Sequence, residues 1–142
     1  MISDKTKQDV INKLTNMTIN DQITWSYLDE NKELCKKNNL YPAYTDHQIV
    51  SSLKNKIHPD KLIFDARDSY VCKVQDFYFL LAKAAPLYES EGVTILMIVP
   101  STLVNSESLY YQGAEVKLNK LIYLVSIKFS NGEECIEKFL KM

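Results

Sequence analysis

Three apolar runs in the middle of the chain predict neighbouring β-strands. Residues 70–74 and 77–84 are rich in β-branched and aromatic side chains, and Asp76 marks a tight turn between them. This arrangement is typical of an antiparallel hairpin. Residues 93–99 form the third run, in which Thr94 is the only polar residue. Because a strand with one solvated face should alternate, we expect this run to be buried on both faces.

Period-two geometry assigns the side chains of this third strand to two faces. Successive side chains of a β-strand point to opposite faces of the sheet. We therefore expect Ile95, Met97 and Val99 on one face, with Leu96 and Ile98 on the other. All five are predicted to be largely buried, so that some element must cover each face.

Helical periodicity predicts helices on both sides of these strands. Apolar residues recur every three or four positions in residues 4–17 and again in residues 46–57, where Thr45 opens a capping-box pattern. Between these two helices, residues 22–28 alternate as a short strand does, and the polar residues 29–38 suit a brief helix.

The last quarter of the chain permits two interpretations. Residues 118–129 carry an apolar stripe at helical spacing, and Ser130 with Glu133 has the spacing of another capping box ahead of a last helix. Alternatively, the region is a strand that ends in a hairpin turn at Asn131 and Gly132. We favour two helices.

These elements together predict one α+β domain over residues 1–142. Its expected architecture is a three- or four-stranded antiparallel meander sheet flanked by amphipathic helices. A length of 142 residues, with 46% hydrophobic and 25% charged residues, is typical of a single globular domain.

Charge and terminal composition narrow the functional classes. The formal net charge is −1, and the cations are sixteen lysines and the single Arg67, so a nucleic-acid partner is not favoured. The first residues are charged where a signal peptide is apolar, and the apolar runs are much shorter than a membrane span. We therefore expect a cytoplasmic protein that does not associate with membranes.

The residue types used in catalysis and metal binding are sparse and scattered. Cys35, Cys72 and Cys135 are widely spaced, and His47 and His58 form no metal-binding motif. The three glycines are isolated, which excludes the glycine-rich loops that bind phosphates. We expect no metal, no cofactor and no catalytic residue.

Aromatic residues near predicted loops, together with the charged pair in the region before residue 70, are the candidate binding residues. Tyrosine and tryptophan are favoured at interfaces because they combine a large contact area with a polar tip. The candidates for ligand or partner binding are Trp25, Tyr41, Tyr44, Arg67, Asp68, Tyr110 and Tyr111.

Two functional hypotheses follow. The first is a small non-enzymatic interaction or regulatory module with an unknown protein partner. The alternative is a small-molecule-binding or hydrolytic enzyme whose pocket is assembled from distant residues. A deep pocket with converging polar groups would favour the alternative, and a flat exposed aromatic patch would favour the module.

The order of these features resembles a loose group of short proteins from low-GC Gram-positive bacteria. The resemblance lies in the early Trp25, the strand that begins near Asp68, the run that ends at Val99, and the apolar residues 118–127. It spans most of residues 20–130 and implies a helix-flanked antiparallel meander. The interaction module proposed above would be of the kind carried by bacterial accessory or mobile-element genes. The group has no established activity, so the resemblance implies no catalytic residue.

The predicted sheet also suggests self-association. It has two apolar faces, and a second copy is the simplest additional cover, so we expect a homodimer whose interface includes the sheet or residues 118–129. The competing possibility is that helices over residues 4–17, 46–57 and 118–140 cover both faces and leave a monomer.

Overall fold

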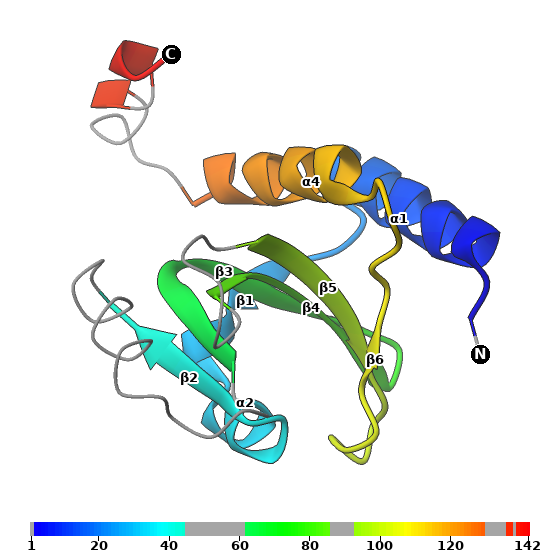
Figure 1. The fold of residues 1–142 in the computed structure, drawn as a ribbon. Coiled ribbons are helices and arrows are strands. Elements are labelled where there is room, and N and C mark those ends of the chain that lie inside the picture. The colour runs from blue at the N-terminus through cyan, green and yellow to red at the C-terminus, as the bar shows by residue number, and fades with distance from the viewer. Residues whose placement is uncertain (1, 45–61, 86–92, 130–135, 138) are drawn as a thin grey trace.

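The computed structural model describes residues 2–44, 62–85, 93–129, 136–137 and 139–142. Within these residues, a twisted sheet lies between two layers of helices (Figure 1). In chain order its elements are α1 (Asp4–Ile19), β1 (Trp25–Tyr27), the 3₁₀ helix η1 (Leu28–Glu30), α2 (Lys32–Lys37), β2 (Leu40–Ala43), β3 (Leu62–Val74), β4 (Phe77–Ala85), β5 (Val93–Val99), β6 (Glu107–Ser108) and α4 (Glu115–Ile127).

The sheet has six strands and is almost entirely antiparallel. Its main path runs β1-β3-β4-β5-β6, and β2 pairs in parallel with the first half of β3. The α+β class and the β3-β4-β5 meander are confirmed, but the predicted three or four strands are too few. The short strands β2 and β6 account for the difference, because β2 includes Pro42 and β6 has only two residues, so neither shows the alternation that marks a strand.

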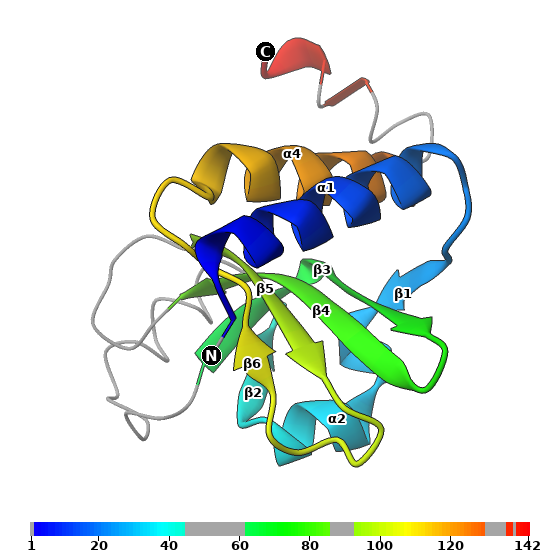
Figure 2. The ribbon, with the colours of Figure 1, turned by 90° about the vertical axis from the view of Figure 1, so that its right-hand side faces the viewer.

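Two helices cover one face of the sheet. Figure 2 shows α1 and α4 side by side across this face, and Leu14, Leu118 and Leu121 are buried between the helices and the strands. Ser3 caps α1, since its side chain accepts a hydrogen bond from the backbone N–H of Thr6. The predicted helix over residues 4–17 is confirmed, and α4 confirms a helix where a strand was the alternative.

Among the described residues, η1 and α2 cover the opposite face. Its core contains Leu28, Leu34 and Phe64, all buried. These short elements pack against β2 and β3. The predicted helix over residues 46–57 lies outside the described residues.

The two predicted faces of β5 are confirmed, but only two of the five named residues are as deeply buried as predicted. Leu96 and Ile98 contribute to the core beneath α1 and α4, whereas Ile95, Met97 and Val99 contribute to the opposite core. Leu96 and Val99 are fully buried. Ile95, Met97 and Ile98 are only half-buried. Ile95 and Met97 lie on the face that carries η1 and α2, away from those two elements, whereas Ile98 lies on the other face and pairs with Glu107 of the edge strand β6.

The predicted capping box at Ser130 and Glu133, and the alternative turn at Asn131 and Gly132, lie outside the described residues. Residues 136–137 and 139–140 are helical. None of the helices in the described part of the chain combines the length and the apolar character needed to cross a membrane.

Candidate functional site

The pairing of β3 with β4 contains a large bulge. Phe64 pairs with Ala84, but the next pair along the ladder is Ser69 with Ala82. The four β3 residues 65–68 therefore lie opposite a single β4 residue. A bulge bends its strand and redirects the side chains that it carries.

Side chains in and beside the bulge accept hydrogen bonds from backbone N–H groups. Asp65 Oδ1 accepts hydrogen bonds from the backbone N–H of Arg67 at 3.0 Å and from its Nε at 2.9 Å. Asp65 Oδ2 accepts a third from Arg67 Nη2 at 3.1 Å. On the facing strand, the backbone N–H of Lys83 donates to Ser69 Oγ at 3.2 Å. The fully buried Ser69 thus replaces a backbone acceptor opposite the bulge.

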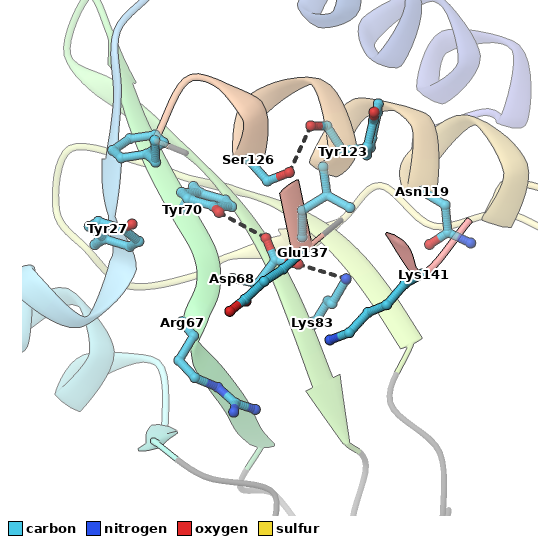
Figure 3. A pocket seen from close by; sticks show the side chains of 12 residues that line it. Tyr27, Arg67, Asp68, Tyr70, Lys83, Asn119, Tyr123, Ser126, Glu137 and Lys141 are labelled. Carbon is cyan, nitrogen blue, oxygen red and sulfur yellow. Dashed lines mark hydrogen bonds and ion pairs between the residues drawn. The ribbon is translucent and has the colours of Figure 1, made fainter. Parts of the chain in front are cut away.

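The bulge forms one wall of a cavity of about 560 Å³ that lies against α4. Figure 3 shows polar side chains from the sheet and from the C-terminal residues directed into this space. The side chains that line it are Tyr27, Arg67, Asp68, Tyr70, Lys83, Asn119, Ile122, Tyr123, Ser126, Phe129, Glu137 and Lys141.

An ordered hydrogen-bonded group lies at the centre of the cavity. Asp68 Oδ1 accepts a hydrogen bond from the Tyr70 hydroxyl at 2.8 Å, and Oδ2 accepts one from Lys83 Nζ at 2.6 Å (Figure 3). Burial and the neighbouring Asp68 carboxylate raise the pKa of Tyr70, so its hydroxyl stays protonated and donates. Asp68 is therefore held from two sides, and it fixes the Lys83 ammonium group at the cavity surface.

One end of the cavity is aromatic. The rings of Tyr27, Tyr70 and Phe129 contact one another, with centroid distances of 4.7 to 5.6 Å. Ile122 of α4 adds an aliphatic contact beside them. On the same helix, Asn119 Oδ1 accepts a hydrogen bond from the Thr94 hydroxyl of β5 at 2.6 Å, which fixes the Asn119 side chain.

The described lining of the cavity offers charged, hydroxyl, amide and aromatic groups. Among the described residues that line it, none is a histidine or cysteine. Cys35 and Cys72 are buried elsewhere, and burial raises the pKa of their thiols to about 11 and about 12 respectively. Both thiols are therefore protonated at neutral pH and are poor nucleophiles.

Of the seven residues that the sequence proposed, only Arg67 and Asp68 come together in the cavity. Trp25 is buried beneath α1, where its Nε1 donates a hydrogen bond to Thr18 Oγ1 at 3.1 Å. Tyr111 is also buried, in the same core beneath α1 and α4. Trp25 and Tyr111 therefore occupy core positions.

The remaining three tyrosines lie on the surface, away from the cavity lining. Tyr41 is an exposed residue of β2. The Tyr44 hydroxyl donates a hydrogen bond to Asp29 Oδ2 at 2.8 Å, and the Tyr110 hydroxyl donates one to Glu115 at the start of α4. These two hydrogen bonds lie in different parts of the described structure.

The most important residue that the sequence analysis missed is Lys83. Its signal was present, because Lys83 is the only charged residue in the apolar strand β4. Glu137 and Lys141 carried no comparable signal, since their place at the cavity depends on the path of the C-terminal residues. The same holds for Asn119, which is one of many polar residues on the surface of its helix.

Comparison of the chain with protein-family models, with curated proteins and with solved structures gives no match.

Proposed function

We propose that this chain is a non-enzymatic binding domain for a small molecule that carries an anionic group. The observation that supports the proposal is the bulge, which presents the cations Arg67 and Lys83 at one cavity and anchors them through Asp65 and Asp68. A cavity of about 560 Å³ is within the usual size of a small-molecule site. Cations held in place before binding lose little conformational entropy when an anion arrives.

The aromatic end of the cavity indicates the rest of the ligand. Tyr27, Tyr70 and Phe129 offer ring surfaces, and Ile122 offers an aliphatic one. A ligand with a ring or short hydrocarbon part beside its anionic group can use both ends of the cavity. This role agrees with the small-molecule alternative of the sequence analysis, without its hydrolytic chemistry.

Binding of three probe compounds tests the proposal. The probes are phenyl phosphate, inorganic phosphate and phenol, compared by isothermal titration calorimetry. We expect phenyl phosphate to bind most tightly, because it alone supplies both a ring and an anion. Absence of heat from all three probes at millimolar concentration would contradict the proposal.

Two matched lysine variants test whether phenyl phosphate binds at this cavity. Lys83→Met should weaken the binding of phenyl phosphate by about tenfold or more, because a hydrogen bond to a charged group contributes about 1.5–3 kcal/mol. Lys73→Met is the control, since Lys73 is an exposed lysine of the neighbouring strand that does not line this cavity. Equal loss in both variants would indicate nonspecific attraction and would count against the site.

A second role, self-association, is supported by exposed apolar residues of α4, one of which, Tyr123, also lines the cavity. On α4, Val116, Tyr123 and Ile127 are 79%, 57% and 42% exposed. Their spacing of seven and four residues places them along one side of the helix. Apolar residues gathered on one helix side are typical of an interaction surface, and a second copy is the partner that we propose.

A further inference from the structure

The cation that Lys83 presents to the cavity is one half of an ion pair. Lys83 Nζ lies 2.6 Å from Asp68 Oδ2, and the exposed fractions of the two side chains are 48% and 23%. An anion that approaches Lys83 therefore also approaches the Asp68 carboxylate, which repels it. A positive charge beside the anionic group of the ligand offsets this repulsion. The ion pair thus favours a ligand that carries charges of both signs.

Asp68 has the capacity to accept a hydrogen bond from such a ligand. A carboxylate has about four acceptor positions. The described residues use two of them, because the Tyr70 hydroxyl donates to Oδ1 and Lys83 Nζ donates to Oδ2 (Figure 3). These two contacts also fix the carboxylate, so it loses little conformational entropy when a cation binds.

The spacing of the two charges matches that of an α-amino acid. In an α-amino acid the ammonium and carboxylate groups are joined through one carbon atom, so a nitrogen and an oxygen lie about 3 Å apart. The charged atoms of Lys83 and Asp68 are similarly close, at 2.6 Å. With the ligand carboxylate at Lys83 and the ligand ammonium group at Asp68, each of the four charges lies beside charges of opposite sign.

The aromatic end of the cavity suits the side chain of an aromatic amino acid. Tyr70 connects this end to the ion pair, because its hydroxyl donates to Asp68 at 2.8 Å while its ring lies 5.0 Å from the ring of Phe129. The ligand side chain is attached to the same carbon atom as the two charged groups. It can therefore extend from the ion pair toward ring surfaces, where an aromatic group packs favourably.

We infer that the ligand is a free α-amino acid with an aromatic side chain, bound with its carboxylate at Lys83 and its ammonium group at Asp68. The inference rests on the proposed function, since it names the class of the anionic ligand. It adds a requirement for a positive charge, which phenyl phosphate lacks.

Three related compounds separate the contributions of the two charges. L-phenylalanine carries both charges at neutral pH, 3-phenylpropanoate lacks the ammonium group, and phenethylamine lacks the carboxylate. We expect isothermal titration calorimetry to show that phenylalanine binds about fivefold or more tightly than either analogue, because it alone forms a charge-assisted hydrogen bond with each half of the ion pair. All three compounds are tested on the unmodified chain, so this comparison does not depend on a variant that folds.

Replacing Asp68 tests the place of the ammonium group. Asp68→Asn keeps the shape of the side chain and an oxygen that accepts from the Tyr70 hydroxyl, but it removes the negative charge. We expect phenylalanine to lose its advantage over 3-phenylpropanoate in this variant. Asp76→Asn is the matched control, since Asp76 is an exposed aspartate in the turn after β3 and does not line this cavity, and it should leave the advantage unchanged.

The outcomes distinguish the ligand class from the binding site itself. Suppose that phenyl phosphate binds in a Lys83-dependent way. If phenylalanine then binds no more tightly than 3-phenylpropanoate, or keeps its advantage in Asp68→Asn, the amino-acid inference is wrong and the anion site stands. If neither phenyl phosphate nor phenylalanine binds the unmodified chain at millimolar concentration, the proposed function fails and the inference fails with it.

Discussion

Lys83 links the folding of the sheet to the chemistry of the cavity. Its backbone N–H donates to Ser69 Oγ opposite the bulge, and its Nζ donates to Asp68 Oδ2. The same residue therefore completes the hydrogen bonding of β4 and supplies a fixed cation. Only the ion pair with Asp68 depends on the lysine side chain, because any residue other than proline supplies the backbone N–H.

Replacing Ser69 tests how the bulge is stabilised. Ser69→Ala should lower the free energy of unfolding by about 1–3 kcal/mol, because a backbone N–H in the sheet loses its acceptor. Urea denaturation measures the change. Ser26→Ala is the control, since the Ser26 hydroxyl makes only a long hydrogen bond of 3.4 Å to the carbonyl of Val71. A loss no larger than that of the control would contradict this role of Ser69.

The buried thiols and the buried Tyr70 hydroxyl predict a loss of stability at alkaline pH. Burial raises the pKa of the Cys72 thiol from 9.0 to about 12. The unfolded chain releases this proton as the pH passes about 9, whereas the folded chain retains it until about pH 12. The stabilisation is thus fully present below pH 9 and is lost as the pH rises towards 12.

Burial also raises the pKa of the Cys35 thiol to about 11 and raises the pKa of Tyr70. Both groups therefore also stabilise the folded chain less as the pH rises. The free energy of unfolding should therefore fall between about pH 9 and 11, and Cys72→Ala should make that fall shallower. Denaturation across this pH range measures both slopes. A free energy that stays constant or increases would exclude this explanation.

At the scale of elements, the sequence predicts best those whose pattern repeats within their own length. The apolar spacing of α1 recurs several times, and the runs of β-branched and aromatic residues in β3, β4 and β5 extend over several positions, so the existence of these elements was predictable. β2 is short and contains Pro42, and it is a strand because β3 lies beside it. The bulge depends on the register between two strands, which the pattern of either strand alone does not contain.

Two substitutions on the same face of β5 test the difference in burial along this strand. Leu96→Ala should lower the free energy of unfolding by about 2–5 kcal/mol, because a fully buried leucine leaves a cavity. Ile98→Ala should cost clearly less, because Ile98 is half-buried. Chemical denaturation of both variants gives the comparison. Equal losses would show that the two positions are covered alike and would contradict the described burial.

At the scale of the whole molecule, the helices and strands of this chain cover much of both sheet faces by themselves. The dimer was expected because the sheet faces needed cover, and that reason is weakened by α1, α4, η1 and α2. The exposed residues of α4 now provide the stronger reason, and they fall within or beside the predicted region 118–129.

We therefore expect a homodimer that Ile127→Glu dissociates, because a charge at a 42% exposed apolar position disfavours burial in an interface. Sedimentation equilibrium at tens of micromolar measures the mass of both proteins. Lys120→Glu is a useful control, since it adds a negative charge to α4 without removing an apolar side chain. The mass of a single 16.4 kDa chain in the unmodified protein would contradict the dimer.

The site as a whole shows why a binding function was harder to predict than the fold. Arg67 and Asp68 stand out because their charges lie at the edge of an apolar run. Their partners Lys83, Asn119 and Lys141 are distant in sequence and meet them only through the sheet register, the position of α4 and the path of the C-terminal residues.

The measurement that tests the central claim most directly is a ¹H–¹⁵N correlation titration of the full chain with phenyl phosphate. The claim predicts saturable shifts concentrated at residues 65–70 and 82–84 and on the Asn119 to Ser126 side of α4. Shifts confined to other parts of the chain, or no saturable shifts at millimolar phenyl phosphate, would contradict an anion-binding cavity at the bulge.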